Sequence, residues 1–585
     1  METIFDFITT EKVKYSKPVE IEDGWSWNMP VHLRRSFLYL NSQFEEQNEN
    51  RELRPFKNIV LPILNIQFRT EGFDVKDIEL YVDNSDEYFK SLLVRKYHIT
   101  WALEKDIDTF IDEFVESYAG YGGALIRKTK GARPNVVKLR TLAFCNQHDL
   151  MNNPFAIFHQ MSFSELRDAV DKLGWGNEGS DIDIETLIEL VKKEKKDVVE
   201  IFEVHGNLPV EFLSDEDASG ESKMDVPQIQ VVAEYMSESG QKAGVTLFRK
   251  KMPKSPFKFI KRDDVENRAL GRGGVEELFE AQTWTNWDEI KIREMMNGAA
   301  KTILWSDDPG MKSRNNLNDL DNNEILNVLE GKTIQQLDTQ PRNLQVFNQS
   351  VDRFWEHSQK IGAASDTLIG EKPSAGTPFK LFEAQQIEDK SLHAYRQGKL
   401  AVFMDEIYRD WILPFFQIEV VKEQNFMQEL SADEMEVVVE KVITKKVNAF
   451  KKQMILSMQE IDDDIVALYD DKVRQDVVKQ GSKRFFKILK DEMKGLPISV
   501  MTNIAGKQKN LNAMTDKIVN VLRQYLATPE LRDDPDMAKL INIILESSGL
   551  DPLTIGPKPK QLAPPALAPG VSTGNPPLAI EEQPA

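Results

Sequence analysis

Residues 365–386, SDTLIGEKPSAGTPFKLFEAQQ, combine glycine, hydroxyl side chains and a lysine just before a helical pattern. Backbone N–H groups at the start of a helix bind anions, so these residue types could hold a phosphate. The residues that give the stretch this character are Ser365, Asp366, Gly370, Lys372, Pro373, Ser374, Gly376 and Thr377. However, no strand precedes it and its glycine spacing fits no phosphate loop. The stretch is therefore either an anion cradle or a loop with a mechanical role.

Other phosphate-binding patterns are incomplete. Residues 329–333, LEGKT, contain the Gly-Lys-Thr of a nucleotide-binding loop, but Leu326 stands where the motif needs its first glycine. The glycine-rich stretches GYGGAL (120–125) and GRGGVEEL (271–278) are weak matches to a dinucleotide fingerprint. The first of them follows a helical pattern instead of a strand, which favours a turn.

Residues suited to catalysis or metal binding are scattered. None of the seven histidines lies at metal-ligand spacing from another. Cys145 has His148 three residues later, but a local Cys/His pair in an Asn/Gln-rich loop is a poor signature of a nucleophile. Acidic runs such as DIDIE (181–185) and DDD (462–464) lie in charged stretches typical of a solvated surface. The sequence gives no case for an enzyme, and we expect neither a cofactor nor a metal.

Composition narrows the class of protein further. The chain has 585 residues, of which 41% are apolar and 29% charged, as in ordinary folded proteins. No apolar run approaches the roughly 20 residues needed to cross a bilayer, and the N-terminus lacks the apolar core of a signal peptide. The single cysteine excludes an intramolecular disulfide and fits a cytosolic origin. The net charge of −21 argues against wrapping nucleic acid, and fits either a solvated surface or a wall that a polyanion passes without binding.

The first half of the chain predicts an α+β region. Apolar residues recur every three or four positions over 86–119, which predicts one long helix that ends at the glycines of GYGG. Alternating or apolar runs predict strands at 120–128, 134–144, 197–209 and 229–236. Two amphipathic stretches predict short helices at 163–175 and 183–196.

The second half predicts paired helices around a small insertion. A helix begins after GRGG (271–274), and its apolar residues spread over several sides, which favours neighbours on several sides. Residues 303–344 are rich in Asn/Asp turns and short strands, and 345–363 return as a helix. The longest helical pattern covers 379–417 and is expected to end near Pro414.

The C-terminal part changes in composition. Residues 431–495 are charged and predict helices, and 496–550 predict a compact helical module. From 551 to 585 the chain is dominated by Pro, Ala, Gly and Leu, which cannot bury a core and predicts a disordered tail.

The order of these parts resembles the portal protein of tailed bacteriophages, over most of residues 60–552. The stretches that carry the resemblance are VESYAGYGGALIRK (115–128) with VVKLRTLAFCNQHDLMNNP (136–154), GRGGVEELFEAQTWTNWDEIKIREM (271–295), PSAGTPFKLFEAQQIEDK (373–390), and the module from MTNIAGKQKNLNAMTDKI to ESSGLDP (501–552). The stretch 271–295 is similar to the G-R-G-x-x-E-x-L … Q … N entry into the portal stem.

The resemblance implies a ring-forming portal fold that is mainly α with α+β parts: wing, two-helix stem, small α/β clip and helical crown. It would place the wing at 1–270 and 379–495, the stem helices at 271–300 and 345–362, the clip at 301–344, the tunnel loop at 363–378, the crown at 496–550 and the Pro-rich tail at 551–585. Stem packing, within one subunit or between ring neighbours, would fall to Trp284, Trp287, Phe354 and Trp355.

Portals form a ring, usually of twelve subunits, at one capsid vertex, and double-stranded DNA is packaged and ejected through the channel. The resemblance therefore implies contacts with other copies of this chain, with double-stranded DNA, with the large terminase subunit at the clip, with head-completion (neck) adaptor proteins, and with the major capsid or scaffold protein. It implies no membrane partner and no nucleotide hydrolysis. Such a protein is made in the cytoplasm of the bacterial host and ends in the virion. Lys372 would be a transient phosphate contact in a loop that faces DNA.

Two alternatives to a portal remain open from the residues. One is a non-enzymatic adaptor or scaffold protein of a virion or other large assembly, which recruits partners through its acidic surface and Pro-rich tail. The other, prompted by Gly-Lys-Thr at 331–333, is a nucleotide-dependent motor.

Overall fold

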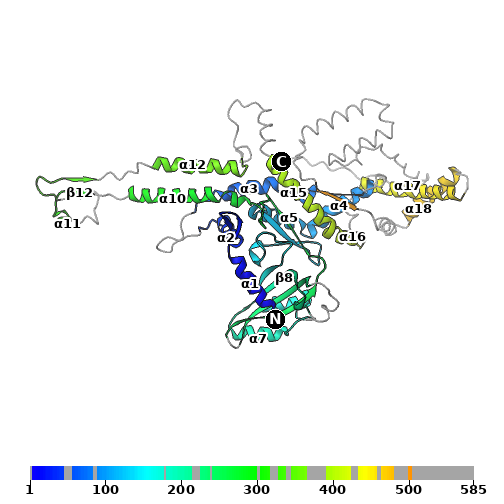
Figure 1. Ribbon diagram of the computed structural model, residues 1–585. Coiled ribbons are helices and arrows are strands. Elements are labelled where there is room, and N and C mark those ends of the chain that lie inside the picture. Colours follow the sequence, from blue (N-terminus) through cyan, green and yellow to red (C-terminus); the bar gives the residue numbers. More distant parts are fainter. Residues whose placement is uncertain are drawn as a thin grey trace, which may run out of the picture. The chain divides into compact units, whose positions relative to one another are not determined.

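The computed structural model describes residues 3–44, 56–82, 88–176, 179–213, 224–237, 240–299, 304–315, 327–336, 344–364, 391–422, 432–457, 463–479 and 498–502. The chain divides into two compact units. The first comprises Met1–Leu430 with Asp462–Lys507, and the second comprises Ser431–Ile461 with Gln508–Ala585. In the second unit, the described residues are the helix α17 (Ala432–Leu456) and Ser457, which follows it. All other elements below belong to the first unit, shown in Figure 1.

Three helices and a hairpin open the chain. They are α1 (Ile4–Ser16), β1 (Val19–Glu22), β2 (Trp25–Trp27), α2 (Met29–Leu40) and α3 (Val60–Glu71). The Thr3 side chain accepts from the Asp6 N–H and the Asp6 carboxylate accepts from the Thr3 N–H, a reciprocal cap that starts α1. The Asn28 side chain caps α2 in the same position, with proline in the first turn.

A five-stranded antiparallel sheet forms the centre of the α+β region. Its order is β10 (Lys242–Lys251), β9 (Asp225–Met236), β8 (Val198–Pro209), β7 (Phe155–Ser162) and β6 (Leu142–Phe144). Both faces are buried, because Val199 and Ile201 of β8 pack in one apolar cluster while Phe202 and Val204 pack in another. The two short helices that the sequence predicts are present as α6 (Phe163–Leu173) and α7 (Ile184–Lys193). They cover the first of these faces.

The predicted helix over 86–119 is two helices, α4 (Tyr88–Glu104) and α5 (Ile107–Tyr121). The break lies at Asp106, whose φ of 54° is left-handed. Aspartate tolerates this conformation better than most residues, and the apolar spacing continues on both sides of it. The periodicity alone therefore does not reveal the break.

The longest predicted helix continues past its expected end at Pro414. Its described part consists of α15 (Ser391–Ile407), one π-helical turn (Tyr408–Ile412) and α16 (Leu413–Lys422), and residues 379–390 of the prediction lie outside the described residues. In the wide turn, the Leu413 N–H bonds to the carbonyl of Tyr408, five residues back. A proline clashes with the carbonyl four residues before it in a regular helix, and the wide turn directly before Pro414 lets the helix accommodate it.

The sequence predicts a helical crown over 496–550, but the described residues at its start form a strand. β14 (Ile498–Thr502) pairs antiparallel with β3 (Ile78–Val82). The Thr502 N–H also donates to Oδ1 of Asp405 on α15, over 2.8 Å. The run ISVMT contains β-branched residues, which favour a strand. The local sequence does not predict the pairing, because the partner strand β3 is distant in sequence. Residues 503–585 lie outside the described part of the chain, as do 480–497, which follow α18 (Asp463–Lys479).

Two neighbouring helices enclose a small insertion, in agreement with the sequence. A short helix α9 (Gly274–Glu277) leads into α10 (Phe279–Ala299), and α12 (Leu344–Ile361) lies beside α10 (Figure 1). Between them in sequence lie β12 (Leu304–Ser306), α11 (Met311–Arg314) and β13 (Ile334–Gln336), with β12 and β13 paired antiparallel. Among the described residues, no helix is long and apolar enough to span a membrane.

The two glycine-rich stretches pack against each other. A second sheet has the order β11 (Phe257–Lys261), β4 (Gly123–Arg127) and β5 (Asn135–Val137), and the turn between α5 and β4 contains Gly122 with φ of 87°. A Cβ on Gly122 would lie 2.4 Å from the carbonyl oxygen of Gly271, and a Cβ on Gly273 would lie 2.5 Å from that of Gly120. The glycines of GYGG and GRGG thus allow two backbones to touch, which is their role in place of phosphate binding.

Replacing Gly122 by alanine tests this contact. Alanine adds the cost of a left-handed residue, about 1–2 kcal/mol, and a backbone clash that the neighbours cannot relieve by a rotamer change. We expect Gly122→Ala to lower the unfolding free energy measured by urea denaturation well beyond Gly174→Ala. Gly174 is the matched control, because it has φ of 82° but open space around its Cβ position. Equal losses in the two variants would contradict the close packing.

Candidate functional site: a buried ionic junction

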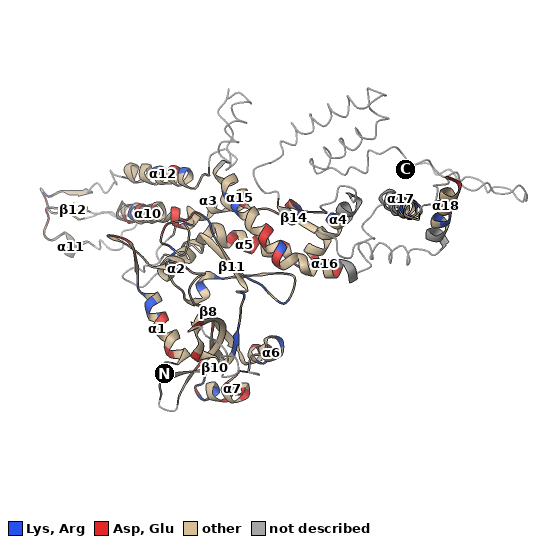
Figure 2. Ribbon diagram, turned by 45° about the vertical axis from the view of Figure 1, so that its right-hand side comes forward, with Lys and Arg blue, Asp and Glu red and all other residues tan. Residues whose placement is uncertain are grey.

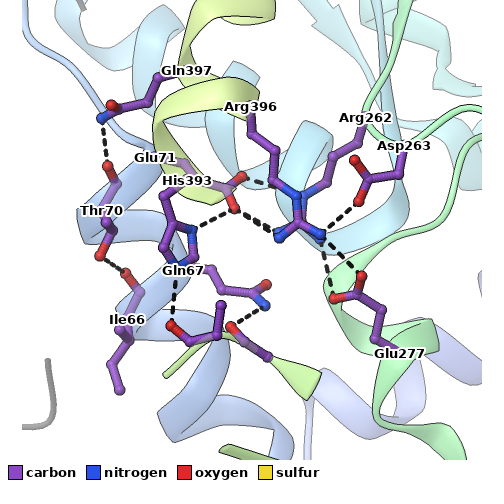
Figure 3. Close-up of polar contacts among 12 residues, drawn as sticks. Ile66, Gln67, Thr70, Glu71, Arg262, Asp263, Glu277, His393, Arg396 and Gln397 are labelled. Carbon is purple, nitrogen blue, oxygen red and sulfur yellow. Dashed lines mark hydrogen bonds and ion pairs between the residues drawn. The ribbon is translucent and has the colours of Figure 1, made fainter. Parts of the chain in front are cut away.

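The most unusual group of side chains in the described residues surrounds Glu71, the last residue of α3. Its carboxylate has no exposed surface. Nη2 of Arg262 donates to its Oε1 over 2.6 Å and Nε of Arg262 to its Oε2 over 3.2 Å. Nδ1 of His393 lies 3.1 Å and Nη1 of Arg396 3.3 Å from Oε1. Figure 3 shows these groups converging from separate segments of the chain.

Two further carboxylates complete the charge balance. Nη2 of Arg396 donates to Oδ2 of Asp263 over 2.6 Å and to Oε1 of Glu277, in α9, over 3.0 Å. Arg262 and Glu277 also face each other, but Nη1 and Oε2 are 3.7 Å apart, beyond hydrogen-bond distance. We call this cluster the ionic junction: Glu71, Arg262, Asp263, Glu277, His393 and Arg396.

The two buried glutamates of the junction differ in electrostatics. Burial alone would raise the pKa of Glu71, but the hydrogen bonds from His393 and Arg262 and the charges of Arg262 and Arg396 outweigh it and lower the pKa to about 2. Burial also raises the pKa of Glu277, and there the attraction of Arg262 and Arg396 does not compensate. Glu71 is therefore the fixed negative centre of the junction, and Glu277 is its weaker acid.

The junction holds the end of α12 against α3 and α15. Nε2 of His393 lies 3.1 Å from the carbonyl oxygen of Ala363, and Nε2 of Gln67 donates to the carbonyl of Gly362 over 3.0 Å. Gly362 fits tightly, since a Cβ there would lie 2.3 Å from Cγ2 of Ile63. The two residues directly after α12 are thus held to α3 and α15 by side chains that contact their backbone carbonyls.

The root of α10 is fastened to the start of α3 by two amide side chains. Oε1 of Gln282 accepts from the N–H groups of Ile59 and Val60, at 2.8 and 3.3 Å, and its Nε2 donates to the carbonyl of Lys57 over 2.7 Å. Oδ1 of Asn286 accepts from the Lys57 N–H over 3.0 Å. These side chains cap α3 from outside, because Ile59 at its N-cap has no side chain able to do so.

The motif positions Glu276 and Leu278 of the stretch 271–295 also have structural partners. Arg268 forms a two-point ion pair with Glu276, at 2.9 and 3.1 Å, and its guanidinium lies 4.3 Å from the ring centre of Trp27. Leu278 is fully buried in an apolar cluster with Ile63 and Leu64 of α3. The whole G-R-G-x-x-E-x-L … Q … N stretch therefore builds the joint between α10 and the α+β region.

A second buried ionic cluster joins the two sheets. Glu203 of β8 accepts from Arg127 of β4 at 2.6 and 2.8 Å, and lies 3.0 Å from Nε2 of both His159 and His205. Burial would raise the pKa of Glu203, but the two histidines and Arg127 hold it well below its usual range. Burial lowers the pKa of His205 in spite of Glu203. No group of histidine, cysteine or acidic residues in the described chain is arranged to hold a metal ion.

The other candidate residues have structural roles where they are described. Lys332 of the Gly-Lys-Thr stretch lies 3.6 Å from the carboxylate of Asp307, whose Oδ1 also accepts from the Thr333 N–H. The stretch leads into the strand β13, whereas a nucleotide-binding loop leads into a helix. Burial raises the pKa of the Cys145 thiol to about 12, which makes it unreactive at neutral pH. His148 lies apart from it, bonded to the carbonyl of Asn267.

The four aromatic residues expected in stem packing fall into two groups. Trp355 packs against the apolar cluster of α3 and α9, Trp287 makes an edge-to-face contact with Phe44, and Phe354 is half-buried. The Trp284 side chain on α10 is instead 51% exposed. The tunnel-loop residues Ser365, Asp366, Gly370, Lys372, Pro373, Ser374, Gly376 and Thr377 lie outside the described part of the chain.

The sequence did not reveal the ionic junction. Its members stand up to 325 positions apart, as Glu71 and Arg396 do, and each alone looks like a surface charge. The one available signal is the placement of Glu71 and Arg396 within apolar helical patterns, which is unusual for unpaired charges.

No protein-family model and no curated protein matches the chain. Among solved structures, the chain is similar to a chain in the neck of an empty gene transfer agent (GTA) particle computed with C6 symmetry, with 9% identity, a TM-score of 0.30, and coverage of 78% of this chain and 100% of that one. It is also similar to chains in the virion of the native GTA particle and in its neck computed with C12 symmetry, each with 10% identity and a TM-score of 0.28. These cover 77% and 78% of this chain and 99% and 100% of theirs.

Gln282→Met tests the joint between α10 and α3. Methionine keeps the volume but removes the acceptor of the buried N–H groups of Ile59 and Val60, and a buried group left unsatisfied costs about 1–3 kcal/mol. We expect a drop of that order in the unfolding free energy followed by tryptophan fluorescence in urea. Gln349→Met, at an exposed position of α12, is the matched control and should change stability by less than about 0.5 kcal/mol. Equal behaviour of the two variants would show that the cap does not hold α10.

Glu71→Gln tests the electrostatics of the junction. The folded-state pKa of Glu71, about 2, lies below its ordinary value of 4.5, so ionisation stabilises the fold at neutral pH, and this stabilisation is lost as pH falls from 4.5 toward 2. We expect the variant to lose on the order of 3 kcal/mol at pH 7 and the difference from wild type to shrink in acid.

Two variants control for the charge change at Glu71. Glu277→Gln should cost less at pH 7, because the raised pKa of Glu277 means that its charge opposes folding. Glu356→Gln, on the exposed face of α12, should be neutral. A loss in Glu71→Gln that stays constant between pH 7 and the acid range would contradict the assignment.

Proposed function

We propose that this chain is a portal subunit, a non-enzymatic protein that forms a ring at one capsid vertex of a phage-like particle. The ring, a dodecamer in this proposal, is the channel through which double-stranded DNA is packaged and ejected. Its partners are the large terminase subunit at the clip, neck adaptor proteins and the major capsid or scaffold protein. In this assignment α10 and α12 are the stem, and β12, α11 and β13 belong to the clip.

The observation that carries the proposal is the exposure of single large apolar side chains on the α10–α12 pair. Gln282 faces α3, and Trp284 lies about 200° around the helix from it, on the side that points away from α3. Trp284 is 51% exposed, and Val346 near the start of α12 is 64% exposed. A large exposed aromatic side chain on a helix that is held firmly by its neighbours is suited to anchor an interface. A ring provides one, since each subunit presents two different faces to its neighbours.

The charges on α10 and α12 are consistent with the wall of a channel that lets DNA pass without binding it. α10 and α12 carry acidic and basic side chains together, as Figure 2 shows, and their described residues form no basic stripe that would capture a polyanion. The buried charged groups of the ionic junction are engaged with one another, which supports a mechanical role in place of catalysis. Virion localisation and the absence of enzymatic activity are parts of the same proposal.

Electron microscopy of the purified full-length chain tests the portal assignment directly. We expect rings with a central hole, and a mass that corresponds to about twelve subunits in sedimentation analysis. A chain that stays monomeric at micromolar concentration, yet still binds virion proteins, would instead favour the adaptor or scaffold function. Retained partner binding after deletion of 344–364 would point the same way.

Trp284→Ala tests the ring interface. Because Trp284 is exposed in the single chain, the variant should fold with unchanged circular dichroism and melting temperature. In a ring it would lose a buried aromatic anchor, which typically costs at least about 2 kcal/mol at each interface, so assembly should shift to higher protein concentration. Trp25→Ala, at a 42% exposed tryptophan on β2, is the matched control. Unchanged oligomer mass across a dilution series would reject the interface role of Trp284.

A further inference from the structure

His393 is the one member of the ionic junction that contacts both Glu71 and the end of α12. Its Nδ1 lies 3.1 Å from Oε1 of Glu71, and its Nε2 lies 3.1 Å from the carbonyl oxygen of Ala363. Both partners are acceptors, because Glu71 is ionised and a carbonyl has no proton to donate. A neutral imidazole carries only one N–H, so it can satisfy only one of them. Both hydrogen bonds form only when the ring carries two protons.

His393 lies within a group of charged side chains. The groups that surround it are Glu71 from α3, Arg262 and Asp263 after β11, Glu277 from α9 and Arg396 from α15. With all three carboxylates ionised and both guanidinium groups charged, these groups sum to a charge of −1, which an imidazolium at His393 would balance.

The residue held by Nε2 is itself in a strained conformation. Ala363 has φ of 50°, in the left-handed region that favours glycine. It closes the C-terminus of α12: the Ala363 N–H bonds to the carbonyl of Lys360 and the Ala364 N–H to that of Gln359, at 3.4 and 2.9 Å. A non-glycine residue keeps this conformation only when its surroundings hold it there. The hydrogen bond from His393 is one of those restraints.

We propose that His393 is a proton-dependent tie between α15 and the end of α12. The doubly protonated ring holds Glu71 and the strained Ala363 together. Loss of one proton leaves the remaining N–H on Nδ1, facing the carboxylate, and places a lone pair opposite the Ala363 carbonyl. The contact with Ala363 is then lost, and the closing turn of α12 loosens, while Gln67 still holds Gly362. This tie is a property of the single chain and does not depend on the portal assignment.

Hydrogen exchange measured by mass spectrometry tests the tie on the full-length chain. The readout is the protection of peptides that cover 354–364, corrected for intrinsic exchange, between about pH 5.5 and about pH 9. We expect protection in the wild type to fall by roughly tenfold as pH rises, the effect of one lost hydrogen bond. Peptides from α6 and α7 in the same sample, which lie away from the junction, should show no such change. Constant protection over this range overturns the proposal.

Four variants identify the group that titrates. His393→Asn offers an N–H in the place of Nδ1 and none toward Ala363, so its protection should be low and independent of pH. His393→Gln places its N–H where Nε2 stands, and should be pH-independent with higher protection than the Asn variant. Ala363→Gly removes the left-handed strain and should reduce the pH-dependent change. His357→Gln, at an exposed histidine of α12, should behave as wild type. Persistent pH dependence in His393→Asn overturns the proposal and assigns the proton to Glu277.

Discussion

A carboxylate without access to water imposes a strict condition on the rest of this fold. Glu71 can remain ionised only if cations and N–H groups reach it, and Arg262, His393 and Arg396 supply them from two distant segments. The end of α3, the segment after β11 and the first turns of α15 must therefore meet in one arrangement. Removing any one partner leaves a buried charge uncompensated, which is far more costly than the contact itself is favourable.

The junction determines which surfaces meet, whereas apolar burial supplies most of the free energy. Ile63, Leu64, Val275 and Leu278 are fully buried between α3 and the start of α10. Buried ion pairs add little net stability compared with apolar side chains of similar size, but they tolerate few alternative arrangements. The close packing of Gly122 on the backbone of GRGG also restricts the arrangement, because it fixes the distance between the α5–β4 turn and the start of α9.

How far the sequence predicts this structure depends on the range of the interactions. The helices α6 and α7, the strands β8 and β9, and the α10–α12 pair follow from local periodicity, and the glycine turn after α5 follows from composition. The break at Asp106 and the passage through Pro414 were missed, because each depends on one unusual backbone turn inside a continuous apolar pattern. The pairing of β14 with β3 and the partners of Glu71 were missed, because they join segments hundreds of residues apart. Trp284 and Trp287 look alike in sequence. Only the fold shows that the Trp284 side chain is exposed whereas that of Trp287 packs against Phe44.

The start of α10 and the end of α12 both lie beside the ionic junction. α10 starts directly after α9, which contains Glu277, and α12 ends at the backbone held by Gln67 and His393. Sliding α10 along its axis would pull Gln282 from the N-terminus of α3, and sliding α12 would break the hydrogen bond from Gln67 to the carbonyl of Gly362. Neither helix can shift far without disturbing α3, and through Glu71 any such disturbance reaches α15. A force applied to the outer side of α10, where Trp284 is exposed, would therefore be transmitted to the first turns of α15 through ion pairs and hydrogen bonds whose geometry allows little compliance.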